Sequence, residues 1–197
     1  MNTDIDEDIF EYLYSHLNPK RLEHSYNVAN LAVSLAERND VNALNAWLAG
    51  LLHDCAKSMT DKELIKFLKN RKKKFKYFKE VSIKSPHLLH SFAGEIIARE
   101  YFKIKNETVL KAIKNHTLGR ENMSILERLI FVADSISHDR KWKYAGTLRE
   151  LAKEDLNKAF FEVLAEKISY VIRDAGWLCP QTIDTWNWYV SNFKKDS

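Results

Sequence analysis

The chain has 197 residues, of which 45% are hydrophobic and 12% aromatic, and its formal net charge is +4. This composition excludes a disordered protein, and the length indicates a single domain covering residues 1–197. Two cysteines, Cys55 and Cys179, exclude a disulfide framework. The acidic N-terminus does not resemble a signal peptide, and no apolar run is long enough to span a bilayer. We therefore expect a cytoplasmic protein without a membrane partner.

Apolar residues recur at three- and four-residue spacing without extended alternation, which predicts an all-α fold. A first helix covers residues 5–17. Asn18 is expected to cap a second helix, and His24 lies on the apolar face of that helix. A third helix over residues 43–52, with Asp40 as its expected cap, is apolar on all sides and therefore buried.

The third helix leads directly into His53 and Asp54, and Lys57 follows one turn later. A buried imidazole and carboxylate are costly unless hydrogen bonds or a metal ion compensate them. Taken alone, the pair is more typical of capping or hydrogen bonding. Adjacent helical side chains point about 100° apart, so the two groups can flank one ion or bridge two.

Three further features follow in the middle of the chain. A capping-box pattern at residues 60–63 predicts a fourth helix. The basic stretch 66–79 is interpreted as a solvated linker, with contact to a polyanion as the alternative. A fifth helix opens at Ser85-Pro86 and carries His90 on its apolar face, although spacing alone leaves His87 as a rival candidate.

The second half of the chain repeats the pattern of buried helices that end in polar groups. A sixth helix ends its apolar stripe at His116. A second capping box, at residues 124–127, opens an apolar helix that leads into Asp134. Two more helices are expected over residues 156–173 and 183–193.

Six polar groups fall on apolar helix faces or at the ends of buried helices: His24, His53, Asp54, His90, His116 and Asp134. Each alone favours a hydrogen-bonding role, but six uncompensated groups in one small core would cost several kilocalories. Imidazole and carboxylate together suit zinc, iron or manganese, and the absence of a cysteine pair argues against a closed structural zinc site. Six ligands exceed the need of one ion, so we predict two ions that share Asp54, an arrangement suited to phosphate-ester and anhydride hydrolysis. Lys57, Arg120 and Arg140 follow these ligands in sequence and are candidates to bind phosphate, with surface salt bridging as the alternative.

The chain resembles the HD-domain superfamily of metal-dependent phosphohydrolases, and over nearly its full length it resembles the YqeK-type symmetrical dinucleoside tetraphosphatases. The motifs that carry the resemblance are His53-Asp54-Cys55-Ala56-Lys57, Leu88-Leu89-His90, His116-Thr117-Leu118-Gly119-Arg120 and Ala133-Asp134. The resemblance implies an HD-type helical bundle with a metal-ligand core at about residues 20–140 and C-terminal helices over residues 147–193. It also implies two metal ions, commonly iron, and hydrolysis of diadenosine tetraphosphate to two ADP.

The resemblance assigns roles to individual residues. The six polar groups match the ligands of the family, which selects His90 over His87. Asp54, Lys57 and Arg120 are expected to be catalytic. The residues expected around the phosphates are Lys57, Thr117, Gly119, Arg120 and Arg140. The loop 135–139 departs from the family pattern and leaves His138 without an assigned role.

Two other functions remain open at this stage. One is an HD phosphohydrolase that acts on another nucleotide, such as a deoxynucleotide or a guanosine alarmone. The other is a non-catalytic HD module that binds a nucleotide or RNA, although no nucleic-acid partner is expected. The donor set also accepts manganese, cobalt or zinc, and a homodimer is left open.

Overall fold

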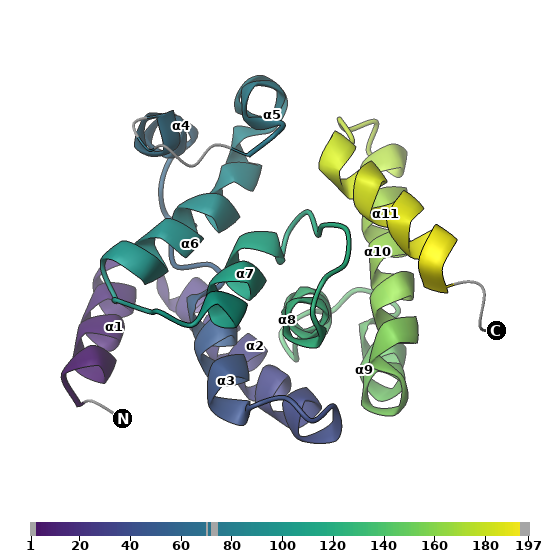
Figure 1. The fold of residues 1–197 in the computed structure, drawn as a ribbon, viewed down its shortest axis with the longest axis horizontal. Coiled ribbons are helices and arrows are strands. Elements are labelled where there is room, and N and C mark those ends of the chain that lie inside the picture. The colour runs from purple at the N-terminus through teal and green to yellow at the C-terminus, as the bar shows by residue number, and fades with distance from the viewer. Residues whose placement is uncertain (1–2, 70, 72–74, 194–197) are drawn as a thin grey trace.

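A computed structural model of the chain describes residues 3–69, 71 and 75–193, and these residues form only helices and their connections (Figure 1). The prediction of an all-α fold is confirmed. The elements are α1 (Thr3–His16), α2 (Pro19–Arg38), α3 (Ala43–Leu52), α4 (Asp61–Lys69), α5 (Phe78–Lys84), a 3₁₀ helix η1 (Pro86–Leu89), α6 (His90–Glu100), α7 (Glu107–Asn115), α8 (Ile125–Ile136), α9 (Ala145–Glu154), α10 (Leu156–Arg173) and α11 (Pro180–Phe193). None of these helices combines the length and the hydropathy that a bilayer-spanning segment needs.

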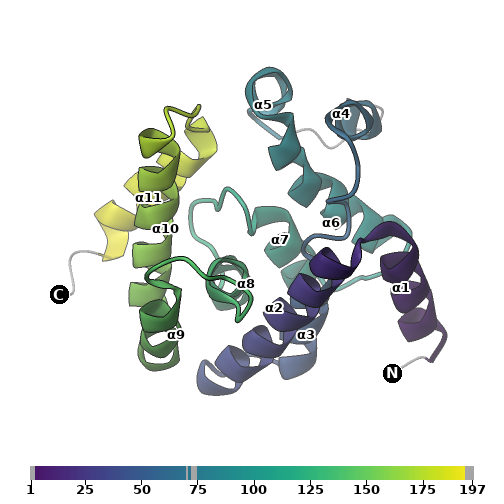
Figure 2. The ribbon, with the colours of Figure 1, turned by 180° about the vertical axis from the view of Figure 1, so that it is seen from behind.

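Helix α8 lies at the centre of the bundle, where Figures 1 and 2 show it surrounded from both sides. It packs against α2, α3, α7, α9 and α10. The five consecutive residues from Leu129 to Ala133 are fully buried, as a helix that is apolar on most sides requires. Asp134 comes next in the chain, so the helix carries a carboxylate into the interior.

Helices α2 and α3 approach each other closely at a glycine. A Cβ atom added at Gly50 would lie 2.7 Å from the Cα of Ala29, so only glycine fits at this crossing. The close approach sets the distance between His24 on α2 and His53, which follows α3. Their ring centroids are 5.2 Å apart.

Most predicted helix starts are confirmed by their caps. The side chain of Asn18 accepts a hydrogen bond from the Arg21 amide at 3.0 Å, and residues 60–63 and 124–127 form the expected capping boxes. The predicted cap of α3 was wrong. Asn42 caps that helix, whereas Asp40 lies in the preceding turn with a φ of 53°, a left-handed conformation that Asp tolerates better than most residues.

Three parts of the helical structure differ from the sequence prediction. The basic stretch 66–79 is not a linker throughout, since residues 66–69 end α4 and α5 begins at Phe78. Residues 70 and 72–74, at the centre of that stretch, lie outside the described residues. Helix α9 was also missed, and the predicted fifth helix begins as the 3₁₀ turn η1 before α6.

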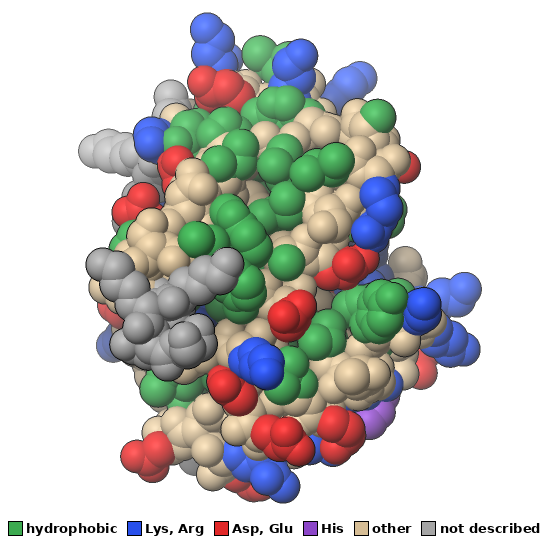
Figure 3. Space-filling model, turned by 90° about the vertical axis from the view of Figure 1, so that its right-hand side faces the viewer, with side chains coloured by type: hydrophobic (Ala, Val, Ile, Leu, Met, Phe, Trp, Pro, Cys, Tyr) green, Lys and Arg blue, Asp and Glu red, His purple; other side chains and the backbone are tan. Residues whose placement is uncertain are grey.

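The C-terminal helices form one side of the molecule. Helix α10 packs on α8 and α9, and α11 packs on α10. Phe160 of α10 joins the two parts of the core, because its ring lies 5.1 Å from Phe131 of α8 and 4.6 Å from Tyr189 of α11. Hydrophobic side chains gather on the outer surface of this side (Figure 3), and the large exposed ones on α10 and α11 include Tyr170 and Ile172.

Candidate metal centre

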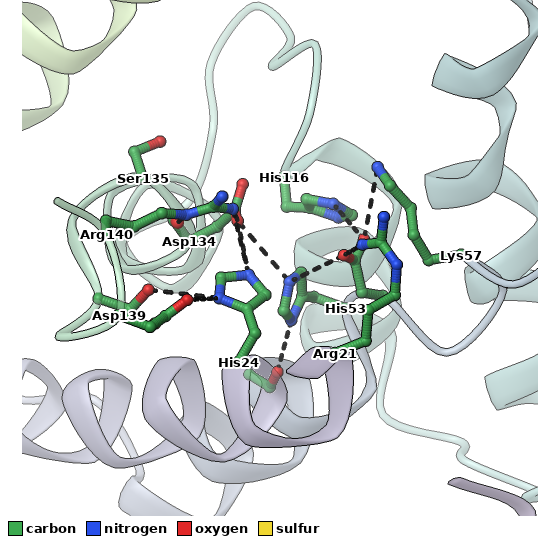
Figure 4. Close-up of polar contacts among 12 residues, drawn as sticks. Arg21, His24, His53, Lys57, His116, Asp134, Ser135, Asp139 and Arg140 are labelled. Carbon is green, nitrogen blue, oxygen red and sulfur yellow. Dashed lines mark hydrogen bonds and ion pairs between the residues drawn. The ribbon is translucent and has the colours of Figure 1, made fainter. Parts of the chain in front are cut away.

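Five helices bring the six predicted metal ligands together in one cluster. His24 projects from α2, His53 and Asp54 directly follow α3, His90 is the first residue of α6, His116 directly follows α7, and Asp134 lies near the end of α8. Figure 4 shows the side chains of His24, His53, His116 and Asp134 pointing toward one another. The four histidines and Asp54 are all at most 6% exposed.

The first half of the cluster consists of His24, His53 and Asp134. One ligand atom from each lies within 4.8 Å of the others. The Nε2 of His24 is 3.1 Å from Asp134 Oδ1, and the Nε2 of His53 is 3.8 Å from the same oxygen. These three atoms therefore face a common point.

The second half consists of His53, Asp54 and His116, whose ligand atoms also lie within 4.8 Å of one another. His90 adjoins this group, since its Nε2 is 3.1 Å from Asp54 Oδ1 and 3.1 Å from His116 Nε2. His53 contributes to both halves. Its Nε2 has one lone pair and can bind one ion, so only a carboxylate such as Asp54 can bridge two.

Three of the imidazoles are oriented by the backbone. The Nδ1 of His53, His90 and His116 each lies 2.6–2.8 Å from the carbonyl oxygen three residues earlier. Because a carbonyl only accepts, Nδ1 carries the proton, and the lone pair is left on Nε2. All three Nε2 atoms point into the cluster in the protonation state that a metal ion requires.

The cluster also contains buried polar atoms without a hydrogen-bond partner, namely His53 Nε2 and Asp54 Oδ1. Such atoms are costly in a protein interior unless an unseen group compensates them. Burial lowers the pKa of His53 to about 4, so its ring is neutral at pH 7. Burial raises the pKa of Asp54, but the neighbouring His53, His116 and His90 hold it well below its usual range. Neutral imidazoles, ionised carboxylates and buried lone-pair atoms without a hydrogen-bond partner together fit bound metal cations.

The other two predicted ligands, His24 and Asp134, are held by a contact with each other and by the carboxylate of Asp139. The Nδ1 of His24 is 2.8 Å from Asp139 Oδ2, which orients the ring so that Nε2 faces Asp134. Burial acts to lower the pKa of His24, but the hydrogen bond to Asp134 raises it above its usual value. Burial likewise raises the pKa of Asp134, yet His24 and nearby cations hold it well below the usual range.

Comparison with known families shows to which family the chain belongs. The family model of the HD domain matches residues 21–139, which include all six predicted ligands. The chain belongs to the HD-domain family. The expected HD-type fold is thereby confirmed.

Individual relatives of this HD protein cover nearly all of it. It is similar to a symmetrical bis(5'-nucleosyl)-tetraphosphatase of Halalkalibacterium halodurans, with 33% identity over 87% of this chain and 90% of the relative. A protein of the same name from Bacillus subtilis is 29% identical over 94% of this chain and 97% of the relative. A solved structure described as a predicted HD superfamily hydrolase involved in NAD metabolism, from Clostridium acetobutylicum, superposes with a TM-score of 0.89. It is 38% identical and the match covers 94% of this chain and 96% of that one.

Two predicted phosphate-binding cations lie beside the predicted metal ligands. The Nζ of Lys57 is 3.1 Å from His90 Nε2 and 3.9 Å from Asp54 Oδ1. The guanidinium of Arg140 bonds Asp134 twice, at the Oδ1 atom (2.7 Å) and at the backbone carbonyl (2.9 Å). Both are placed to meet an anion that approaches the cluster.

The other predicted substrate residues differ in position. Thr117 lies at the site, with its hydroxyl 3.2 Å from His90 Nε2. Gly119 has a φ of 69°, and an added Cβ would lie 2.8 Å from Thr185, which explains the glycine by packing. Arg120 is engaged by a buried carboxylate, since its Nε and Nη2 bond Glu127 at 2.7 and 2.6 Å. The phosphate-binding roles of Gly119 and Arg120 stay predictions.

Sequence reasoning missed three residues that contact the ligands. Arg21 lies 3.3 Å from Asp54, and it precedes His24 by one helical turn on the same face of α2. Asp139 lies just after α8, which extends to Ile136 into the predicted loop 135–139, and the neighbouring His138 is exposed. Lys167 lies 3.6 Å from Asp134. The one sequence feature that could have indicated this contact is the position of Lys167 on the inward face of α10.

A cavity of about 910 Å³ opens beside the cluster, between η1, the end of α8 and helices α10 and α11. Asp134, Thr117 and Arg140 form its inner wall. Aromatic side chains, including Trp142 and Trp177, line the remainder, and the exposed His87 lies at its edge. The volume lies in the upper part of the range for sites that hold small-molecule ligands.

Proposed function

We propose that this chain hydrolyses symmetrical dinucleoside tetraphosphates, and that it cuts diadenosine tetraphosphate into two ADP at a pair of metal ions held by the six clustered ligands. The observation that carries the proposal is the convergence of four histidines and two aspartates beside a large cavity, which Asp134 lines. The names of the full-length relatives from Halalkalibacterium halodurans and Bacillus subtilis support the choice of substrate.

The ligands divide between two ions in this proposal. His24 and Asp134 would hold one ion and His90 and His116 the other, while His53 is within reach of both. Asp54 would be the shared ligand, because its Oδ2 lies 3.8 Å from His53 Nε2 while its Oδ1 lies 3.1 Å from His90 Nε2. Bound divalent ions would supply Lewis acidity, lowering the pKa of water and neutralising charge on phosphoryl oxygens.

The cations beside the ligands bind the phosphates. Lys57 approaches the cluster from the side of His90, and Arg140 approaches from the side of Asp134. A tetraphosphate bound between them would receive positive charge at both ends of the cleaved bond. Charge-assisted hydrogen bonds of this kind are about twice as strong as neutral ones.

The cavity wall suits a nucleoside. Trp142 is fixed by a hydrogen bond from its Nε1 to the Ser135 carbonyl at 2.8 Å, and Tyr144 lies next to it. Tyr170 and Trp177 line the same cavity from α10 and from the segment after it. Aromatic faces of this kind stack on bases, which gives about 1–3 kcal/mol per base in nucleic-acid complexes.

Iron is the metal that the family resemblance favours for this centre, whereas the donor set itself accepts several first-row metals. Metal analysis of the protein purified without added metal tests the assignment. Iron at about two equivalents per chain supports it, and zinc or manganese at that stoichiometry contradicts it. A cytoplasmic location and a homodimer stay predictions.

Product analysis tests the proposed function. Metal-loaded protein is incubated with diadenosine tetraphosphate, and the products are separated by ion-exchange chromatography. Two ADP are expected, and formation of ATP and AMP would refute symmetrical cleavage. NAD, a deoxynucleoside triphosphate and a guanosine alarmone serve as comparison substrates, since faster turnover of any of these would favour another HD phosphohydrolase. RNA binding that survives loss of Asp54 would favour the non-catalytic alternative.

A further inference from the structure

Lys167 reaches the metal centre from outside the segment that matches the HD domain. It lies on α10, and its Nζ is 3.6 Å from Asp134 Oδ2 and 3.4 Å from the carbonyl oxygen of His116. The same Nζ sits 4.1 Å above the ring centroid of Phe131. A helix of the C-terminal part thus places a cation against one ligand of each half of the cluster.

The ammonium group of Lys167 shares its carboxylate with a second cation. Asp134 is already bonded through Oδ1 by Arg140 at 2.7 Å. Two cations therefore share one carboxylate that is also a metal ligand.

The number of cations around the cluster also indicates that Lys167 is available to bind an anion. Among the described residues, the side chains of Arg21, Lys57, Arg140 and Lys167 contact the ligands or lie within ion-pair distance of them. Metal ions bound by the carboxylates would compete with these cations for the same oxygens. The ammonium of Lys167 stands on a flexible stem and can then turn to an incoming anion.

The anion has an obvious path to Lys167, because Lys167 itself lines the cavity. Tyr170 and Arg173 follow it on α10 at steps of three residues, and they line the same cavity. These three positions span about 9 Å of one helix face, at about 1.5 Å per residue. Lys167 is the residue at the metal end of this face.

We propose that Lys167 is a phosphate-binding residue of the active site, which holds an oxygen of the phosphate next to the metal centre. This inference rests on the proposed hydrolysis of dinucleoside tetraphosphates and adds a residue to the binding of their phosphates. Arg140 and Lys57 bind the phosphates from the sides of α8 and α3, and Lys167 binds them from the side of α10.

Binding of ADP by calorimetry tests the proposal without turnover. The variants are Lys167→Met, which keeps the aliphatic stem, and Lys167→Arg, which keeps the charge. Lys153→Met is the matched control, since Lys153 lies on α9 in a salt bridge with Glu150. Loss of one charge-assisted hydrogen bond is expected to weaken ADP binding by metal-loaded Lys167→Met about 10- to 100-fold. Arginine is expected to restore most of the affinity, and the Lys153 control to bind as the wild type.

A purely structural role for Lys167 gives a different pattern. It would lower the melting temperature or the metal content of Lys167→Met while leaving the affinity of the metal-loaded fraction for ADP unchanged, and that result overturns the proposal. Affinity of Lys167→Met for ADP should also depend less on salt than that of the wild type. If the wild type binds ADP through Lys167 but does not cleave diadenosine tetraphosphate, the proposed function fails and the binding role stands. If the wild type cleaves it and Lys167→Met binds ADP normally, only the role of Lys167 fails.

Discussion

Replacement of Asp54 by asparagine tests the bridging role on which the two-ion centre depends. The substitution keeps the size of the side chain and removes its charge. Asp54 is 4% exposed, and its oxygens face His53 on one side and His90 on the other. Asparagine offers one neutral oxygen, so it can serve at most one of the two ions.

The size of the effect on turnover follows from the number of ions affected. Loss of an outer partner of a metal ligand costs about 10- to 100-fold in metal affinity or activity. A direct ligand of two ions loses at least this much at each, so Asp54→Asn should lower kcat by about 10²- to 10⁴-fold, or about 3–5 kcal/mol. The effect on stability of the metal-free protein should be small. The paired Arg21 and Lys57 are 39% and 25% exposed and can turn to water, which limits the cost to about 1 kcal/mol.

The assay measures kcat, metal content and melting temperature on the same preparation. Asp184→Asn is the control, because Asp184 is a partly exposed aspartate that accepts a hydrogen bond from the Tyr77 hydroxyl at 2.6 Å, away from the cluster. We expect the control to keep wild-type turnover. Wild-type turnover by Asp54→Asn at matched metal content would refute the bridging role and with it the division of the ligands described above.

Four further predictions concern the support of the site. Gly50→Ala should destabilise the protein by at least about 1–3 kcal/mol in denaturant unfolding, since its Cβ would press on the α2 backbone. Asp139→Asn should weaken metal binding about 10- to 100-fold in chelator competition, because His24 loses its orienting carboxylate. Arg120→Ala should lower the melting temperature because the buried Glu127 loses its cation and keeps only the hydrogen bonds from Asn115 and Ser124, and an increase in KM without that loss would instead support a phosphate role. Burial raises the pKa of Glu127 but Arg120 holds it below its usual value, so this stabilisation is present at neutral pH and is lost as the pH falls below about 4.5, a loss that Glu127→Gln should reduce in pH-dependent unfolding.

The six residues that cluster could be picked out from the sequence because each lies on a periodic apolar face or at its end, and their role as metal ligands stays a prediction. Helical spacing fixed the inward direction of His24, and the apolar stripe of α8 led to the carboxylate of Asp134. Spacing did not separate His90 from His87, since the two lie on the same short segment. The 3₁₀ turn η1 places His87 at the edge of the cavity and His90 in the cluster.

Contacts that depend on the packing of distant helices could not be predicted in this way. Lys167 is separated from Asp134 by 33 positions and reaches it only because α10 packs on α8. Helix α5 has only seven residues and lies in a stretch of lysines, so its periodic signal was too short to recognise. The placement of Arg120 on Glu127 was equally hidden, because a capping box by itself does not reveal which cation its glutamate binds.

The way the histidines are held explains why a cation centre forms at this place in the bundle. His53 and His116 each stand one residue beyond a helix, and the Nδ1 of each donates to the carbonyl three residues earlier. Carbonyls in the last turn of a helix have no partner within the helix, so these bonds satisfy them and fix the imidazole tautomer at the same time. The same ends carry the negative pole of the helix dipole, which favours a nearby cation. Two helices, α3 and α7, therefore aim both a lone pair and a partial negative charge at the cluster, and the carboxylates of Asp54 and Asp134 add two formal negative charges where divalent ions would bind.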